Sequence, residues 1–331
     1  MANIDDVAKK AGVSRSTVSR VLLGGSKVKP STKELVLRVI EEMNYSPNTA
    51  ARALAAKKSQ NIGVVSSYTF NDPFYSIIEE EIYHTCEQLG YNTLFVINRV
   101  NEKGHKDPIE VLNGKVDGFI YLGDHSVTAE QLSKLLKMKI PVAVFKTGVS
   151  MPGVLEADID NIDAAYRGTE YLMKLGHRRI AVLYGQLDYY ENIDRLTGYK
   201  NALKDNGIEF DEKLMFCGGF SYNNALNLSQ EIINTKASAV FCFNDAMAHG
   251  FIRGAKNCNC YVPDDITVLG YDDIIFSNYA SYIALTTVKQ PITDMGKYLA
   301  EALIGQIEKG NPAEKKIFST TISEKETSRK V

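Results

Sequence analysis

Residues 4–22 read IDDVAKKAGVSRSTVSRVL, two short helical stretches joined by the turn signal AGVS. Asn3 is a suitable N-cap for the first stretch, and Gly12 can adopt the left-handed conformation that ends a helix. In the second stretch the apolar residues recur at a spacing of three and four, so its arginine and hydroxyl side chains lie on the opposite face. Two helices in this arrangement are typical of a helix-turn-helix motif, whose second helix enters the major groove of DNA.

The sequence that follows predicts a third helix in the same small domain. The stretch STKE (31–34), after Pro30, has the pattern of a capping box and predicts where this helix starts. Its periodicity predicts five buried side chains: Leu35, Val36, Val39, Ile40 and Met43. Charge sets the segment apart as well, since residues 1–60 carry 11 lysines and arginines against 5 acidic residues, while the whole chain has a net charge of −2. A basic head on an acidic remainder favours a module that binds polyanions.

The rest of the chain alternates apolar strands with helical stretches, in two sets. The strands of the first set are 62–67, 92–97, 118–122 and 142–145, and those of the second are 180–185, 214–218, 239–243 and 267–271. Such alternation predicts parallel sheets flanked by helices, and two sets predict two lobes. The expected fold is an all-α helix-turn-helix head plus an α/β two-lobed core. Ligands bind such folds outside the carboxyl ends of the strands, so the expected site is a cleft between the lobes.

Composition and motifs argue against several other classes. No run approaches the roughly 20 apolar residues of a membrane span. The first residues, MANIDDVAKKAGV, lack the regions of a signal peptide, so we expect a cytoplasmic protein. The 5 cysteines have no zinc-binding spacing and the histidines form no HExxH pattern, so we expect no metal and no cofactor. The absence of GxGxxG, P-loop and GxSxG motifs argues against an enzyme.

Long blocks of the chain resemble the lactose/galactose-repressor (LacI/GalR) family of bacterial transcriptional regulators. The likeness covers nearly the whole chain and is most specific in the head, 4–22 and 28–54, and in the blocks GHRRIA, FND and GYDD. It implies a helix-turn-helix DNA-binding domain over 1–46, a hinge helix and linker over 47–60, and an effector-binding and dimerisation core over 61–331. That core is implied to resemble periplasmic sugar-binding proteins, with an N-lobe at about 61–160 and 291–320, a C-lobe at about 161–290, and crossings near 160, 290 and 320.

The resemblance also implies which head residues meet DNA. Arg15, Ser16 and Arg20 would read bases, with Thr17 and Ser19 nearer the phosphates; arginine suits this role because it can bond guanine O6 and N7 together. Further phosphate contacts are expected from Asn3, Ser14, Lys27 and Lys29, and these would position the head without specifying sequence.

The segment PNTAARALAA (47–56) is shorter than the roughly 12–15 residues that an isolated helix needs, so it should be frayed alone. The resemblance implies a hinge helix that pairs with its dimer mate in the minor groove and inserts Leu54 into a base step. Asn48, Ala51 and Ala53 are the other expected DNA contacts of this segment. The small alanines would let the two hinge helices of a dimer approach closely. Our hypothesis is that an effector in the cleft shifts this segment between folded and frayed states.

For the effector site, the resemblance points to Asp72, Phe74 and Tyr75 from the first lobe. It adds Arg195, Phe220, Asn244 and Asp272 from the second lobe, and Gln290 from a crossing segment. Aromatic rings with carboxylate, guanidinium and amide groups suit a polyhydroxylated ring, so a saccharide is the first choice. Lys146, in FKTG (145–148), stands where the family commonly has Asp or Arg, which leaves the sugar open. A purine effector and control by a phosphocarrier protein remain alternatives.

A solute-binding protein of a sugar transport system is the main rival, since it would share the two-lobed body. It would need an export signal and would have no use for the basic head. The function we expect is therefore a homodimeric, DNA-binding regulator, a repressor of carbohydrate-utilisation genes on a pseudo-palindromic operator.

Overall fold

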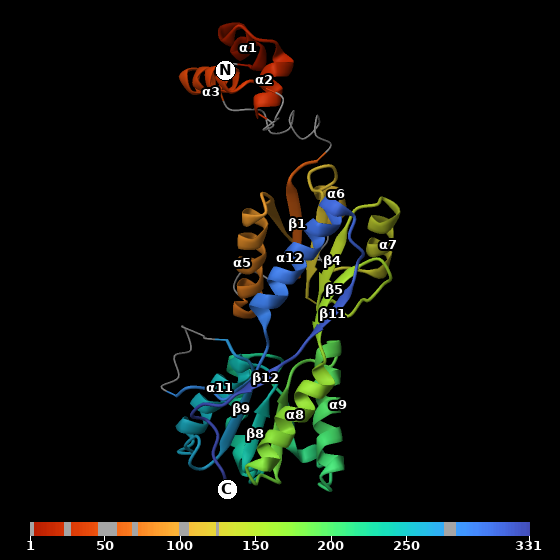
Figure 1. Cartoon of the computed structure of the whole chain (residues 1–331). Helices are drawn as coiled ribbons and strands as arrows, with labels where there is room; N and C mark the ends of the chain where they lie inside the picture. Colours follow the sequence, from red (N-terminus) through yellow and green to blue (C-terminus); the bar gives the residue numbers. More distant parts are fainter. Residues whose placement is uncertain are drawn as a thin grey trace. The chain divides into compact units, whose positions relative to one another are not determined.

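The computed structural model describes residues 3–22, 28–45, 58–67, 72–98, 106–123, 126–274 and 283–331. The chain divides into two units, Met1–Gln60 and Asn61–Val331, which are drawn together in Figure 1 and described separately below. The architecture is the one predicted: a helical head, and a core of two mostly parallel sheets flanked by helices.

The first unit contains α1 (Ile4–Ala11), α2 (Arg15–Leu22) and α3 (Pro30–Glu42). Asn3 caps α1 as predicted, because its side-chain oxygen accepts hydrogen bonds from the backbone N–H groups of Asp5 and Asp6 at 2.8 and 3.0 Å. Gly12 ends the helix with φ of 63°, a left-handed conformation that glycine adopts without strain. The turn into α2 follows directly, as a helix-turn-helix requires.

The start of α3 differs from the prediction. The helix begins at Pro30, its N-cap is Lys29, and no side-chain cap is present, so the predicted capping box over 31–34 is wrong. Proline's fixed φ suits the first helical position and sets the boundary earlier. Leu35 is 41 % exposed rather than buried, because the core-facing positions are Val36 and Val39 at a spacing of three, and the preceding residue points about 100° away. Ile40 and Met43 pack against this core while partly exposed.

The N-lobe is built on a six-stranded sheet in the order β11-β5-β4-β3-β1-β2. Its strands, all paired in parallel, are β1 (Asn61–Ser66), β2 (Asn92–Ile97), β3 (Gly118–Leu122), β4 (Val142–Phe145), β5 (Leu155–Ile159) and β11 (Lys315–Phe318). Helices α5 (Pro73–Gln88) and α12 (Ile292–Lys309) lie side by side on one face (Figure 1), and α6 (Pro108–Val111) and α7 (Ala129–Lys137) cover the other. Val64 and Val65 illustrate the consequence, since these neighbours belong to different cores on opposite faces.

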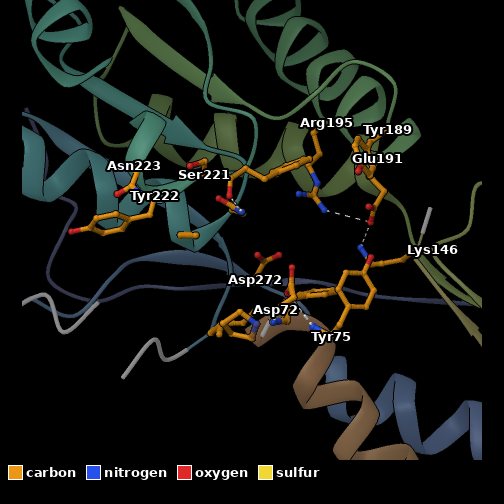
Figure 2. Close-up of a pocket in the computed structure, with 16 residues that line it drawn as sticks. Asp72, Tyr75, Lys146, Tyr189, Glu191, Arg195, Ser221, Tyr222, Asn223 and Asp272 are labelled. Carbon is orange, nitrogen blue, oxygen red and sulfur yellow. Dashed lines mark hydrogen bonds and ion pairs between the residues drawn. The ribbon is translucent and has the colours of Figure 1, made fainter. Parts of the chain in front are cut away.

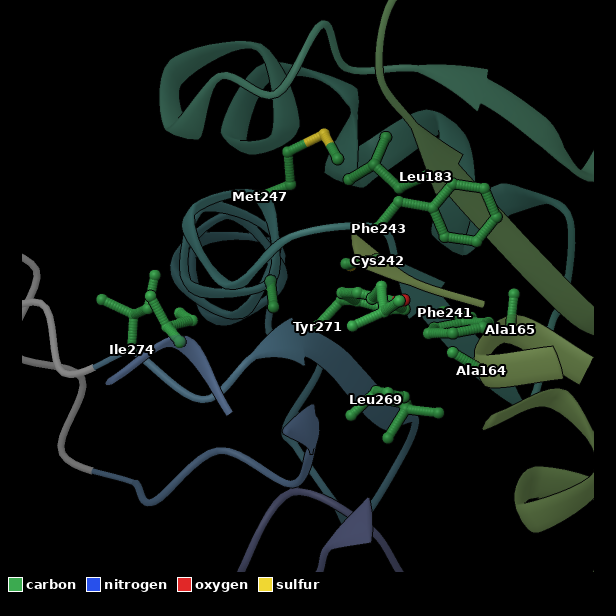
Figure 3. Close-up of a cluster of buried hydrophobic side chains, with 14 of the residues drawn as sticks. Ala164, Ala165, Leu183, Phe241, Cys242, Phe243, Met247, Leu269, Tyr271 and Ile274 are labelled. Carbon is green, nitrogen blue, oxygen red and sulfur yellow. The ribbon is translucent and has the colours of Figure 1, made fainter. Parts of the chain in front are cut away.

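The C-lobe repeats the arrangement with the order β12-β10-β9-β8-β6-β7. Its strands are β6 (Ile180–Tyr184), β7 (Met215–Cys217), β8 (Ala239–Cys242), β9 (Thr267–Asp272), β10 (Thr287–Lys289) and β12 (Thr321–Ser323), and β12 alone among these described strands runs antiparallel. The flanking elements are α8 (Asn161–Lys174), α9 (Tyr190–Asp205), α10 (Tyr222–Asn234), α11 (Asp245–Asn257) and the 3₁₀ turn η1 (Glu212–Leu214). Figure 3 shows the core between them, where Phe241 packs edge-on to Phe243 at 5.2 Å and lies stacked with Tyr271 at 6.5 Å.

Three segments carry the chain between the lobes: from β5 to α8, from β10 to α12, and from β11 to β12. Residues 321–331 belong to the C-lobe. The expected lobe ranges, which ended at residue 320, did not include them. The amide of Val268 donates to the carbonyl of Thr327 at 2.8 Å. The amide of Val331 donates to the carbonyl of Leu175 at 2.9 Å. In the portion of the chain that the structure describes, no helix has the length and apolar character to cross a membrane.

Candidate functional site

The first candidate site is the polar face of α2 in the head. Val18 and Val21 are buried, so Arg15, Ser16 and Arg20 lie exposed on the outside of the helix. Arg15 is 68 % exposed, and a guanidinium nitrogen lies 3.6 Å from a carboxylate oxygen of Asp5. Ion pairs this exposed stabilise little, so the guanidinium can move to another partner.

Hydroxyl groups hold the beginning of α2. Ser14 Oγ accepts from the amide of Thr17 at 3.1 Å and lies 2.8 Å from Ser16 Oγ and 2.9 Å from Thr17 Oγ1. Ser14 is thus the N-terminal cap of α2, while Ser19 and Thr17 are half-buried. Lys29 is exposed at the start of α3, and the side-chain oxygen of Asn3 is occupied in capping α1.

The other predicted DNA contacts lie outside the described residues: Lys27, Asn48, Ala51, Ala53 and Leu54.

The second candidate site is a cavity of about 330 Å³ between the lobes of the core (Figure 2). Of the predicted effector residues, seven line it: Asp72, Phe74, Tyr75, Arg195, Phe220, Asn244 and Asp272. Gln290 contributes indirectly, because its Nε2 donates to Asp272 Oδ1 at 2.6 Å. Sequence reasoning missed Tyr189, Glu191, Ser221, Tyr222 and Asn223, and treated Lys146 only as a departure from the family pattern.

Four helices begin at this cavity, because each follows the carboxyl end of a parallel strand: α5, α9, α10 and α11. Three of them are capped by side chains. Asp72 Oδ1 accepts from the amides of Phe74 and Tyr75 at 2.9 and 3.3 Å. Ser221 Oγ accepts from the amide of Asn224 at 3.4 Å, and Asn244 Oδ1 from that of Met247 at 2.9 Å. These caps occupy N–H groups that would otherwise point at a ligand.

A buried ion pair joins the two lobes inside the cavity. Lys146 follows β4 in the N-lobe, and its Nζ donates to Oε1 of Glu191 in the first turn of α9 in the C-lobe. The guanidinium of Arg195, one turn further along α9, lies 3.7 Å from the same carboxylate (Figure 2). Burial would raise the pKa of the Glu191 carboxyl, but the charges of Lys146 and Arg195 bring it below its ordinary value.

Arg195 is held on every side by the C-lobe. Its Nε donates to Asn161 Oδ1 at 3.0 Å, its Nη1 donates to the carbonyl of Phe243, and its guanidinium lies 3.9 Å from the centre of the Tyr271 ring. A guanidinium stacked and bonded in this way has a single orientation.

Two further carboxyl groups border the cavity. Burial raises the pKa of Asp272 to about 7, against the lowering effect of the neighbouring Arg195 and Lys146 charges. Burial likewise raises the pKa of Asp72, although the two backbone hydrogen bonds that it accepts act in the opposite direction. Aromatic rings complete the walls; those of Tyr189 and Phe220 meet edge to face at 6.0 Å. Carboxylates beside aromatic faces suit hydroxyl groups carried on a ring.

Comparison with known proteins places both sites in one context. Residues 3–48 match the model for bacterial regulatory proteins of the lacI family, and residues 169–328 match a periplasmic binding protein-like domain. The HTH-type transcriptional repressor PurR of Vibrio atlanticus (strain LGP32) is 36 % identical to this chain over 96 % of the chain and 95 % of its own length.

Two solved structures are similar to this chain over nearly its whole length. A transcriptional regulator CelR–cellobiose complex has 28 % identity and a TM-score of 0.70, covering 99 % of this chain and 100 % of that one. A lac repressor dimer bound to operator and the anti-inducer ONPF has 26 % identity and a TM-score of 0.83, covering 99 % of each chain.

Proposed function

This chain belongs to the lacI family of bacterial regulatory proteins, and we propose that it is a transcriptional repressor whose hold on operator DNA is controlled by a small molecule in the cavity between its lobes. The observation that carries the proposal is the combination, in one chain, of an exposed helix with basic residues and a polar cavity between two lobes. The compared relatives are transcriptional regulators, and we propose no catalytic role for the cavity.

The head supports the DNA-binding part of the proposal. Arg15, Ser16 and Arg20 share the exposed face of α2, where they can reach base edges when the helix lies in the major groove. We propose that Lys29 and the hydroxyl groups at the start of α2 contact phosphates, and that these contacts orient the head. The lac repressor relative binds its operator as a dimer, and we propose the same assembly here on a pseudo-palindromic operator.

The cavity supports a saccharide as the effector. Its carboxyl groups and aromatic rings can bind hydroxyls and stack on a sugar ring, and the CelR relative holds cellobiose. We further propose that residues 47–60 couple the two functions, with Leu54 inserted between bases. Operator affinity of Leu54→Ala, measured with and without ligand, tests this; an affinity equal to that of the wild type removes Leu54 from the mechanism.

The experiment that tests the whole proposal begins with operator selection from random duplexes by the full-length protein. Titration calorimetry with mono- and disaccharides then follows, with and without the selected DNA. We expect a sugar whose affinity changes when DNA is bound, because coupling between two sites is reciprocal. A protein that selects no sequence, or a ligand that leaves operator affinity unchanged, contradicts the proposal.

A further inference from the structure

We propose that the cavity between the lobes takes an uncharged ligand and rejects phosphate esters and other anions, and that Glu191 sets this preference. This inference rests on the proposed effector role of the cavity, and it names the class of ligand. It follows from how the charged side chains around the cavity are paired.

The cations that line the cavity are already neutralised. Among the described lining residues, Lys146 and Arg195 are the two with positive charge, and both contact the carboxylate of Glu191. The side chain of Lys146 is 1 % exposed and that of Arg195 is 5 % exposed, whereas that of Glu191 is 11 % exposed. The side chain of Glu191 thus has a larger exposed fraction than either cation that it pairs with.

The other charged groups of the lining are also acidic. Asp72 and Asp272 border the cavity, so its described charged residues are three acids and two bases. Among the described lining residues, both positive charges are thus already paired with a carboxylate, and an anion would have to compete with it.

Helix N-termini normally attract anions, and four of them meet at this cavity. Here the amides of α5, α10 and α11 are engaged by their own caps, Asp72, Ser221 and Asn244. At α9 the first turn carries Glu191, whose negative charge already complements the helix dipole. Side-chain caps at three of the four helix starts, and an acidic first turn at the fourth, thus reduce the attraction that these helix starts offer to phosphate.

An anionic ligand that takes Lys146 and Arg195 as partners must displace Glu191 from them, which would leave a buried carboxylate without a partner. A neutral polyol can instead donate its hydroxyls to the carboxylates and leave the ion pair intact. Removal of the carboxylate should reverse the preference, because it frees two buried cations that face the cavity.

The test uses inorganic phosphate as the probe on the full-length protein, with chloride at matched ionic strength as the reference. Calorimetry and thermal unfolding should show no phosphate binding by the wild type. Glu191→Gln should bind phosphate measurably, at least about tenfold more tightly than the upper limit that the wild-type titration sets, and tenfold corresponds to about 1.4 kcal/mol. Glu170→Gln is the matched control, because it removes a carboxylate of the same lobe that pairs with Lys174 at 2.7 Å, away from the cavity, and should behave as the wild type.

Glu191→Ser provides a second variant with the same expected gain if the glutamine variant does not fold. Neutral sugars and their phosphate esters, compared pairwise on the wild type, provide a measurement that needs no variant. Phosphate binding by the wild type, tighter binding of an ester than of its parent sugar, or folded Glu191 variants no better than the control would overturn the inference. An ester that also alters operator affinity would overturn the inference alone, whereas loss of all coupling to DNA would count against the proposed function.

Discussion

Gln290 donates a hydrogen bond of 2.6 Å to Asp272, and this contact ties the wall of the cavity to the segment that returns the chain to the N-lobe. Asp272 ends β9 and borders the cavity, while Gln290 directly follows β10 and lies two residues before α12. A ligand that bonds to Asp272 therefore acts on a residue already connected to the crossing segment. Ligand binding in the cavity can therefore change the relative position of the two lobes through this hydrogen bond.

The raised pKa of Asp272 predicts a specific pH dependence of stability. Its folded-state pKa is about 7, so between about pH 4 and 7 the native protein keeps a proton that the unfolded chain has released. The free energy of unfolding contributed by this group is present below that window and falls as the pH rises through it. Asp272→Asn cannot ionise and still accepts from Gln290, so its stability relative to the wild type should rise by about 1–3 kcal/mol from pH 5 to pH 8.

Urea unfolding of both proteins at the two pH values measures this difference. Asp264→Asn serves as the control, because Asp264 is 78 % exposed in its pair with Arg329 and should give curves parallel to the wild type. Equal pH dependence of Asp272→Asn and the wild type would contradict the prediction.

The pair of Lys146 and Glu191 should be strongly non-additive in stability. Lys146→Met leaves a buried carboxylate with Arg195 as its remaining partner, and should cost about 3–5 kcal/mol in the free energy of unfolding. Glu191→Leu in the same molecule should recover part of that loss, because the apolar pair of similar volume has no charge to desolvate. Recovery should be incomplete, since Arg195 then loses its carboxylate partner. A double-mutant cycle by urea unfolding checks this, and single effects that simply add would refute it.

Two adjacent residues of α3 should differ sharply in their contribution to the head. Val36 is fully buried and Leu35 is 41 % exposed, so Val36→Ala should destabilise the head by about 1–3 kcal/mol. Leu35→Ala should change the stability of the head by no more than about 0.5 kcal/mol, although this substitution removes more atoms than Val36→Ala does. Hydrogen exchange of the amides in 3–45, measured on the full chain, separates the head from the core. Equal effects would mean that Leu35 is covered in solution.

Arg15→Ala should weaken operator binding without changing the fold. Its ion pair with Asp5 is exposed at 3.6 Å and contributes little to stability, so the melting temperature should stay unchanged. Loss of a bidentate contact to guanine should cost about 1–3 kcal/mol and relax the preference at one base pair. Fluorescence anisotropy on the selected operator and on single-base variants measures both effects. An equal loss of affinity on every DNA sequence would instead mean that Arg15 contacts a phosphate.

Local patterns in the sequence predicted most of the fold because they report local physics. The strand at 92–97 follows from the alternation of apolar strands with helical stretches. The cap at Asn3 follows from the preference of N-cap positions for short polar side chains. The start of α3 was wrong because two valid signals competed, and proline at the first helical position prevailed over the capping-box pattern.

The candidate site was predictable only in part. Residues that follow a strand, such as Asp72 and Asn244, are found by their position in the alternation. The contact of Lys146 with Glu191 joins residues 45 positions apart in different lobes, and no local periodicity encodes it. One local signal was available, since Glu191 and Arg195 are spaced i, i+4 on a helix that begins at the cavity.

The order in which the strands are joined has a consequence for synthesis on the ribosome. The N-lobe sheet receives its edge strand β11 only after every strand of the C-lobe except β12 has emerged, and the C-lobe then receives β12 and the terminal tail. The N-lobe cannot be completed before β11 leaves the exit tunnel, and the C-lobe cannot be completed before β12 does. Both must therefore wait in partly assembled form with an open sheet edge, a state in which nascent chains are prone to aggregate.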